Sequence, residues 1–563
     1  MKKLFAFFTA CALAATVMNA QNFEWARGFG GPKNDFGSSL RIDTSGNIYI
    51  TGYFKETVDF DPGSGTYYLT SEGYEDVFVQ KLDASGNVLW AKSFGGTGVD
   101  EGHSIAVDAS GNVYTVGVFE ETIDFDPGAG TYNLTSAGDY DVFLQKLDAS
   151  GNFVWAKSFG GMGWDAAYSL SIDALGNVYT TGWFQGTVDF DPGLGTYYLT
   201  SEGFTDVFLQ KLDASGNFVW AKSFGGMEHD VGVFLSIDDS GNVYTTGFFR
   251  GTSDFDPGAE MYNLTSAGEE DIFIQKLDAS GNFVWAKSFG GAYFDRAYSL
   301  SIDALGNVYI TGYFNGMVDF DPGVGTYNLI SEGKEDVFIQ KLDTSGNFVW
   351  AKSFGGIYSD LASSLSIDVS GNVYVTGVFE GAVDFDPGAG THYLISAGEE
   401  DVFIQKLDAS GNFLWAESFG GTGWDVAYAL SIDALENVYT TGAFRATADF
   451  DPGAETYDLT SEGGWDVFIH KMSQTSVGVV ENDFGRQLLF HPNPSAGDFV
   501  IDLGDVYDLT EIAITDMNGK LVYASTLRQT QTANISLKKA PAGVYLLRIQ
   551  SGKKRAVVKL VKN

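Results

Sequence analysis

The sequence predicts an all-β fold built from seven copies of one unit, and three recurring features of its 563 residues support this prediction. A tryptophan, the triplet Phe-Gly-Gly and the string DFDPG each recur seven times at an interval of 65 residues. The tryptophans are Trp25, Trp90, Trp155, Trp220, Trp285, Trp350 and Trp415. A fixed interval of this length is typical of repeat architectures, so we expect each copy to form one supersecondary unit.

One unit, taken over residues 95–159, contains four runs with the composition of β-strands. The runs are SIAVD (104–108), VYTVGVF (113–119), DVFLQKLD (141–148) and FVWAKSF (153–159). β-Branched and aromatic residues dominate them, and clusters of Gly, Asn, Asp and Ser bound them. Short turns join the first two runs and the last two, and a loop that contains DFDPG joins the second to the third. The unit therefore predicts a four-stranded antiparallel sheet.

Seven such sheets in succession predict a seven-bladed β-propeller over residues 22–472. The alternative, a β-helix, has coils far shorter than 65 residues. In the fourth run of the unit, the four consecutive residues 153–156 are all apolar. Such a run predicts a strand that is buried on both faces, as it would be between two neighbouring blades.

The two ends of the repeat region are complementary. Residues 22–27 match only a fourth strand, whereas residues 466–472 match a third strand that no fourth strand follows. We therefore expect the N-terminal strand to complete the last blade and close the ring, which removes an exposed sheet edge.

The first turn of each unit reads D-x-S-G-N or a close variant of it. The Asp side chain is expected to accept backbone N–H groups of the turn, and the Gly to adopt a positive φ. In the seventh unit Glu436 replaces this Gly, at an expected cost of about 1 kcal/mol. A second recurring Asp, Asp35 in the first copy, follows each Phe-Gly-Gly triplet. We interpret it as a cap of the linking turn; the functional alternative is an anionic ring that gathers cations.

Residues 1–20 have the features of a secretory signal peptide: a basic start at Lys2 and Lys3, an apolar run over 4–17 and the small residue Ala20 before a cleavage site. The alternative is a membrane anchor, but the run is shorter than the roughly 18–20 residues that a spanning helix needs. We expect no transmembrane segment elsewhere. The only cysteine, Cys11, lies in this segment, so the mature chain would contain no disulfide.

The charge balance limits the class of partner. The chain has 33 Lys and Arg against 73 Asp and Glu, a formal net charge of -40. Because the phosphates of DNA and RNA would be repelled, we expect no nucleic-acid partner. The charge balance reverses from Arg486 onward, where the sequence has 11 basic and 6 acidic residues.

This change of composition predicts a separate domain at residues 488–563, after a linker at 473–487. The strand-like runs of residues 488–563 predict a small β-sandwich.

Motifs of catalysis are absent from the sequence. None of the five histidines recurs at the repeat interval or forms a metal-binding pair, and no nucleophile elbow or phosphate loop occurs. Paired aspartates in DFDPG are the candidate ligands of a calcium ion, which binds six to eight oxygens. In the first three units they are Asp59, Asp61, Asp124, Asp126, Asp189 and Asp191. The alternative is that both carboxylates are solvated or bonded to amides of their own loop.

Sequence variation identifies a candidate binding face. The D-x-S-G-N turns are nearly uniform and share one end of the propeller, whereas the DFDPG loops and the links after Phe-Gly-Gly lie at the other end. Aromatic side chains and one histidine in these links are the candidate ligand-binding residues. They are Trp164, His229, Tyr293, Phe294, Tyr358 and Trp424. Exposed aromatic rings among carboxylates suit a sugar, a peptide or a cationic partner. The structural alternative is that the rings plug the channel mouth or cover blade edges.

Two resemblances extend this prediction. On the motifs GNVYTTGxF, DVFxQKLDxSGN and WAKSFGG, residues 22–472 resemble the seven-bladed β-propeller repeat family of secreted bacterial proteins. Residues 488–563 resemble the C-terminal sorting domain of the type IX secretion system of Bacteroidota. The residues that carry the second resemblance are Pro492, Asn493, Pro494, Gly497, Gly519, Gly543, Lys559, Leu560, Val561 and Lys562. It implies recognition by an outer-membrane translocon, removal of the tail, and release or attachment at the cell surface. The alternative is a generic adhesive β-domain.

The sequence thus predicts a secreted or cell-surface protein whose variable face recognises a glycan or a protein without catalysis. An extracellular hydrolase or lyase acting on a polymer is the first alternative, and a passive surface structural protein is the second. The sequence names no certain cofactor.

Overall fold

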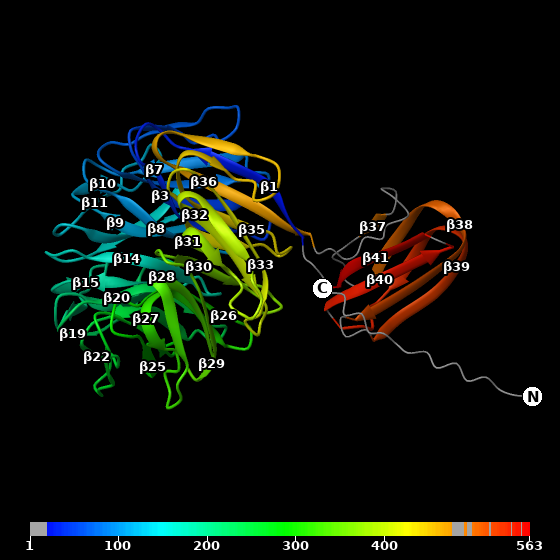
Figure 1. Cartoon of the computed structure of the whole chain (residues 1–563). Helices are drawn as coiled ribbons and strands as arrows, with labels where there is room; N and C mark the ends of the chain where they lie inside the picture. Colours follow the sequence, from blue (N-terminus) through cyan, green and yellow to red (C-terminus); the bar gives the residue numbers. More distant parts are fainter. Residues whose placement is uncertain are drawn as a thin grey trace, which may run out of the picture. The chain divides into compact units, whose positions relative to one another are not determined.

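The computed structural model describes residues 20–475, 489–491, 498–516, 520–541, 543–552 and 554–562, and within these ranges the regular structure is β-strand (Figure 1). Residues 1–19 of the predicted signal peptide and residues 476–487 of the predicted linker lie outside the described residues. The chain divides into two compact units, of which Phe23–Ser473 is the larger and the second contains the C-terminal strands.

Each repeat forms an antiparallel four-stranded sheet, as predicted. The first sheet contains β2 (Phe36–Ile42), β3 (Ile48–Phe54), β6 (Asp76–Leu82) and β7 (Val88–Phe94), and the second β8 (Glu101–Val107), β9 (Val113–Phe119), β12 (Asp141–Leu147) and β13 (Phe153–Phe159). The third contains β14 (Ala166–Ile172), β15 (Val178–Phe184), β18 (Asp206–Leu212) and β19 (Phe218–Gly226), and the fourth β20 (Asp230–Ile237), β21 (Val243–Phe249), β24 (Asp271–Leu277) and β25 (Phe283–Phe289).

The last three sheets follow the same order. The fifth contains β26 (Arg296–Ile302), β27 (Val308–Asp319), β28 (Asn328–Leu342) and β29 (Phe348–Phe354), and the sixth β30 (Leu361–Ile367), β31 (Val373–Asp384), β32 (Tyr393–Leu407) and β33 (Phe413–Gly421). The seventh contains β34 (Asp425–Ile432), β35 (Val438–Asp449), β36 (Asp458–Thr475) and, as its outermost strand, β1 (Ala20–Phe29).

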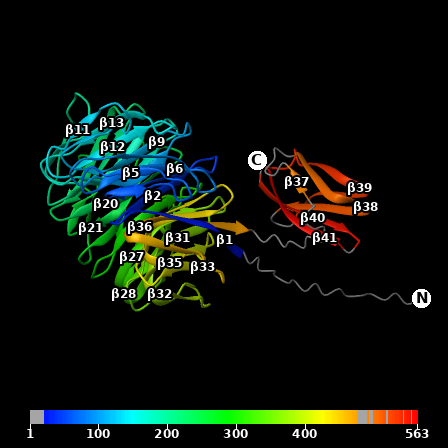
Figure 2. The ribbon, with the colours of Figure 1, turned by 90° about the horizontal axis from the view of Figure 1, so that it is seen from above.

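The first strand of each sheet lies beside the first strand of the next, and β2 lies beside β34, so the sheets follow one another around a ring. The N-terminal strand β1 pairs with β36 from the other end of the repeat region (Figures 1 and 2). The ring of Trp25 contacts Tyr439 on β35 at a centroid distance of 6.5 Å. The seventh sheet therefore combines strands from the two ends of the propeller sequence.

The loops that contain DFDPG are more ordered than the sequence predicts. In the first unit β4 (Thr57–Asp59) pairs with β5 (Tyr68–Thr70) as a small hairpin. The equivalents are β10 (Thr122–Asp124) with β11 (Asn133–Thr135), β16 (Thr187–Asp189) with β17 (Tyr198–Thr200), and β22 (Thr252–Asp254) with β23 (Asn263–Thr265). In the last three units the hairpin continues the second and third strands without a break.

The third strand of each sheet is more deeply buried than the fourth, for which the sequence predicts burial on both faces. The third strand β12 is buried at every residue except the half-buried Lys146. The prediction that the fourth strand is buried on both faces is wrong, because it is the outermost strand of its sheet and Val154 is 47% exposed. The core between the blades is aromatic: Phe125 of DFDPG packs against Phe119 at 5.5 Å and against Phe143 at 5.4 Å.

The recurring aspartates have the structural roles expected of them. Asp43 accepts hydrogen bonds from the backbone N–H groups of Ser45 at 2.8 Å and Asn47 at 2.9 Å. Glu436 adopts a φ of 64°, the left-handed conformation that the equivalent glycines adopt in the other units. Asp35 is fully buried and accepts hydrogen bonds from the N–H groups of Gly31 at 2.7 Å and Lys55 at 3.0 Å, so it caps its linking turn.

The C-terminal unit has the all-β character that the sequence predicts. Its strands are β37 (Leu489–His491), β38 (Asp498–Asp516), β39 (Leu521–Ser536), β40 (Gly543–Ser551) and β41 (Lys554–Lys562). They pair in the order β37-β38-β40-β41, and β39 also pairs with β38. Residues from four of the strands share one core, among them Ile501, Ile535, Leu547 and Leu560.

Candidate functional site

The predicted ligand-binding residues lie in the links between blades, and most of them pack against their own surroundings. Trp164 is 52% exposed, and its indole N–H donates a hydrogen bond to Asp139 Oδ2 at 2.8 Å. Its ring meets Tyr140 edge-on at 5.6 Å. His229 is exposed and stacks on Phe204 at 5.1 Å. These contacts hold Trp164 and His229 over two different blades.

The tyrosines of the next two links cover glycines. A Cβ atom built on Gly316 would lie 3.1 Å from the ring of Tyr293, and one on Gly381 would lie 3.0 Å from the ring of Tyr358. Both tyrosines thus lie against bare backbone. Phe294, at 42% exposure, lies 5.8 Å from the guanidinium of Arg296. The contacts of these rings do not join them into one cluster.

Among the predicted ligand-binding residues, Trp424 belongs to a larger group of aromatic rings. We call this group the aromatic patch, and it consists of Phe36, Tyr53, Trp424, Tyr428 and Trp465. The Trp424 and Trp465 rings lie 6.2 Å apart, and Trp465 lies 5.7 Å from Phe36. Phe36 also contacts Tyr53 at 5.1 Å and Tyr428 at 6.3 Å. The rings come from the first and the seventh blade.

The aromatic patch is accessible and lies near negative charge. Trp424 is 48% exposed and Tyr428 is 38% exposed, while the other three rings are half-buried. Burial, and to a smaller extent the charge of Glu400, raises the pKa of Tyr428 to about 12. Burial also raises the pKa of Tyr53, with smaller contributions from Glu101 and Glu75. The hydroxyl groups therefore stay protonated at neutral pH, and the patch presents neutral rings.

Four of the five patch residues are absent from the sequence-based candidates. A usable signal for two of them was that they depart from the repeat. The position of Trp465 is occupied in the other units by Glu75, Tyr140, Thr205, Glu270, Glu335 and Glu400. The position of Phe36 likewise varies, with Glu101 and Ala166 in the next two units. Comparing the repeats column by column identifies both positions.

The carboxylates of DFDPG bond to their own loop, which is the alternative considered above. Asp59 Oδ1 accepts the N–H groups of Asp61 at 3.1 Å and Tyr67 at 2.7 Å, and Asp61 Oδ1 accepts the N–H of Gly63 at 2.8 Å. Phe60 between them is fully buried. Among the described residues no three His, Cys, Asp or Glu side chains gather as a metal site would require. The same bonds recur at Asp124, Asp126, Asp189 and Asp191.

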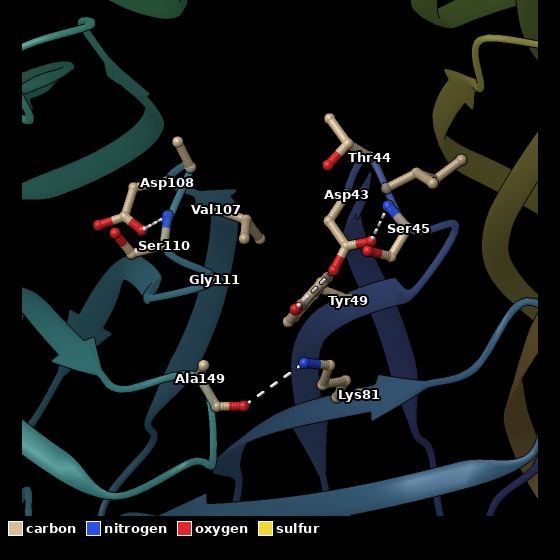
Figure 3. Close-up of a pocket in the computed structure, with 12 residues that line it drawn as sticks. Asp43, Thr44, Ser45, Tyr49, Lys81, Val107, Asp108, Ser110, Gly111 and Ala149 are labelled. Atoms are coloured by element: carbon tan, nitrogen blue, oxygen red, sulfur yellow. Dashed lines mark hydrogen bonds between the residues drawn. The ribbon is translucent and has the colours of Figure 1, made fainter.

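The face that carries the uniform turns has a shallow pocket between the first two blades (Figure 3). Asp43 Oδ2 accepts a hydrogen bond from the Tyr49 hydroxyl at 3.0 Å, and Lys81 Nζ lies 4.9 Å above the Tyr49 ring. Lys81 also donates to the carbonyl of Ala149 in the next blade at 3.4 Å. These polar groups therefore serve the contact between two blades.

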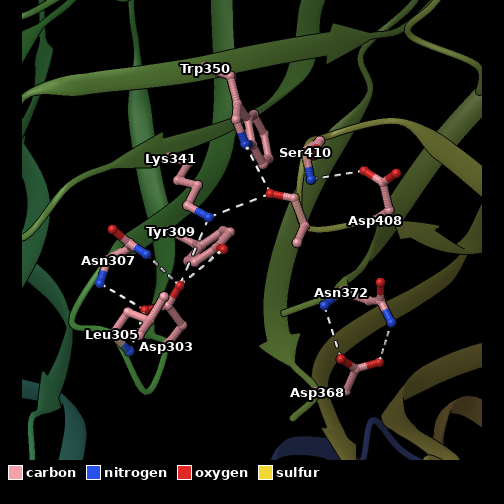
Figure 4. A network of polar contacts seen from close by, with 11 residues as sticks. Asp303, Leu305, Asn307, Tyr309, Lys341, Trp350, Asp368, Asn372, Asp408 and Ser410 are labelled. Carbon is pink, nitrogen blue, oxygen red and sulfur yellow. Dashed lines mark hydrogen bonds and ion pairs between the residues drawn. The ribbon is translucent and has the colours of Figure 1, made fainter. Parts of the chain in front are cut away.

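The same arrangement recurs between the fifth and sixth blades (Figure 4). Lys341 donates to the carbonyl of Ala409 at 3.4 Å and lies 4.7 Å from the ring of Tyr309. Its Nζ is 3.9 Å from Asp303 Oδ2. A contact that repeats from blade to blade is scaffold, so we do not take this face as the functional site.

Part of the predicted sorting signal lies on paired strands. Gly543 pairs with Lys562, Val544 with Val561, Tyr545 with Leu560 and Leu546 with Lys559, and Leu560 is fully buried. Pro492, Asn493, Pro494, Gly497 and Gly519 lie outside the described residues. In the part of the chain that the structure describes, no helix is long and apolar enough to cross a membrane.

Comparisons with known families agree with both resemblances. Residues 489–563 match the family described as the secretion system C-terminal sorting domain. Residues 24–53 and 89–118 match the family described as the β-propeller repeat.

Two curated proteins are similar to this chain in sequence, at 25% and 26% identity. An uncharacterized WD repeat-containing protein of Acanthamoeba polyphaga mimivirus is 25% identical over 503 residues, which are 75% of this chain and 36% of the relative. The regulatory protein FlaEY of Caulobacter vibrioides is 26% identical over 258 residues, which are 45% of this chain and 25% of the relative. The chain thus spans about a third and a quarter of their lengths.

A solved structure, the extracellular domain of a hybrid two-component system from B. thetaiotaomicron, aligns with 95% of this chain and 100% of its own at 10% identity. Its TM-score is 0.17. The sorting domain indicates export through the type IX secretion system to the cell surface or beyond. The chain therefore contains β-propeller repeats and, over residues 489–563, a C-terminal secretion sorting domain.

Proposed function

We propose that this protein recognises an extracellular glycan or protein without catalysis and that the aromatic patch is its binding surface. The observation that carries the proposal is the patch itself, with two neighbouring tryptophans and two further rings packed around Phe36. Aromatic rings that are accessible and clustered are the side chains that most often dominate binding energies. Phe36 and Trp465 also depart from the repeat, which further supports a role beyond the scaffold.

Two carboxylates near the patch already contact other side chains of the protein. Glu75 is paired with Lys55 at 2.7 Å, and Glu101 with His103 at 3.0 Å. The other site residues proposed from the sequence, Trp164, His229, Tyr293, Phe294 and Tyr358, would extend the surface along the links of other blades.

The proposal is tested with the full chain on arrays of glycans and peptides, using the double variant Trp424→Ala/Trp465→Ala. Tyr198→Ala/Tyr393→Ala is the matched control, because both rings are exposed, at 64% and 65%, and lie outside the proposed surface. We expect the double variant to lose at least tenfold in affinity for any ligand found and the control to retain it.

Melting temperatures of the three proteins check that the variants fold. Equal binding by wild type and double variant would overturn the proposal. So would release of soluble product from the bound polymer, which would favour a hydrolase or lyase.

A further inference from the structure

A pair of like charges faces the aromatic patch from the sixth blade. Glu380 on β31 and Glu400 on β32 are directly opposite each other in the register of the two strands. Like charges at opposed positions of an antiparallel pair destabilise the sheet. Burial raises the pKa of Glu400, and the charges of Glu380 and Glu399 raise it further.

Other blades place a cation in the same position. In the first blade Lys55 replaces Glu380 and pairs with Glu75, the equivalent of Glu400, at 2.7 Å. In the fourth blade Arg250 replaces Glu380 and pairs with Glu269, the equivalent of Glu399, at 3.1 Å. The sixth blade therefore has a third carboxylate where these two blades have a compensating positive charge.

This acidic group adjoins the aromatic patch. Glu400 lies on β32 and Tyr428 on the contacting strand β34, and the charge of Glu400 contributes to the raised pKa of the Tyr428 hydroxyl. The loop before Glu399 packs on the link that leads to Trp424, since a Cβ atom built on Gly398 would approach the backbone of Thr422 to 2.6 Å. The carboxylates and the accessible faces of Trp424 and Tyr428 thus belong to one surface.

We propose that this surface binds a positively charged side chain, a lysine or arginine of a protein partner. The inference rests on the proposed function and names the chemistry of its ligand. A cation over an aromatic ring gains electrostatic attraction, and it would also supply the positive charge that Glu380 and Glu400 lack. A neutral sugar would satisfy the rings and leave the opposed carboxylates uncompensated. A partner protein with a basic segment fits both features.

The test uses the full chain and two probes, the peptide acetyl-Lys-Lys-Lys-amide and the same peptide with acetylated ε-amino groups. Binding is followed by tryptophan fluorescence and by titration calorimetry. We expect the charged peptide to bind at least tenfold more tightly than the acetylated one. The variant Glu380→Gln/Glu400→Gln should lose about tenfold in affinity for the charged peptide, and Trp424→Ala/Trp465→Ala should lose a similar factor.

A matched control separates this site from general attraction by an acidic protein. Glu260→Gln/Glu455→Gln removes the same charge from exposed positions in two DFDPG loops and should leave affinity unchanged. Equal losses in the two glutamine variants, or equal binding of the two peptides, would overturn the inference. If an array ligand depends on Trp424 and Trp465 but not on Glu380 and Glu400, the proposed function stands and the cationic ligand is refuted. If no ligand depends on the tryptophans, the proposed function fails as well.

Discussion

Buried carboxylates at the junctions of the blades predict that the protein loses stability as the pH rises. Asp206 is 2% exposed; its Oδ2 accepts the N–H of Glu202 at 3.1 Å, while its Oδ1 has no hydrogen-bond partner among the described residues. Asp230 of the next blade lies nearby, since a Cβ atom on Gly225 would be 2.8 Å both from Asp206 Oδ1 and from Asp230 Oδ2. Burial raises the pKa of Asp206 to about 6 and the pKa of Asp230 to about 7.

The sign follows from proton binding. The pKa of Asp206 lies above its usual 3.8, so between about pH 4 and pH 6 the native state binds more protons than the unfolded chain. This contribution to the free energy of unfolding is complete below pH 4 and is lost as the pH rises through 6. A difference of about two pH units corresponds to about 3 kcal/mol.

The variant Asp206→Asn isolates this effect, because asparagine has the shape of the protonated acid and no charge. We expect the variant to match the wild type below about pH 4 and to be more stable at pH 8 by up to about 3 kcal/mol, measured by urea unfolding. Asp213→Asn is the control of opposite sign. Hydrogen bonds from Asn217 and Ser215 lower the pKa of Asp213, so its loss should destabilise the protein at pH 8. An Asp206→Asn variant that is less stable than wild type at pH 8 would refute the reasoning.

Three further predictions follow from the fold and the tail. Phe29→Ala on β1 should lower the free energy of unfolding by about 3–5 kcal/mol, as much as Phe159→Ala at the equivalent position within the ring. A negligible change on chemical unfolding of the Phe29 variant would contradict the packing of Phe29 against Phe60 and Phe78. Thermal melts with calcium and with a chelator should superimpose, because Asp59 and Asp61 already accept loop amides; a rise in melting temperature with calcium would restore the metal hypothesis. A periplasmic reporter fused to residues 485–563 should leave a host that has the type IX system, and retention in the periplasm would argue against the sorting function.

The repeat allowed most of the fold to be predicted. A fixed interval of 65 residues places every strand and turn once one unit is interpreted, and the incomplete units at the two ends predicted that β1 joins β36. The hairpins in the DFDPG loops were missed because their strands are only three residues long in the first four units, and in the last three they continue strands that were already predicted. The exposure of Val154 was missed because an apolar run does not reveal which strand forms the outer edge of a sheet.

The candidate site was predicted less completely, and the reason is geometric. Phe36 and Trp465 lie near opposite ends of the propeller sequence, and their rings meet because the first blade lies beside the seventh. Analysis of single links found Trp424 but gave no indication of which rings it would touch. Glu380 and Glu400 are unremarkable in a chain of this charge until strand register places them opposite each other.

Closure of the ring by the two ends of the propeller sequence is the central claim, since it assembles both the seventh blade and the aromatic patch. Hydrogen exchange of the full chain followed by mass spectrometry tests it most directly. We predict that the backbone amides of residues 22–29 are protected to the same degree as those of the equivalent strand at 153–159. Exchange of 22–29 within seconds, at the rate of a free terminal peptide, would contradict it.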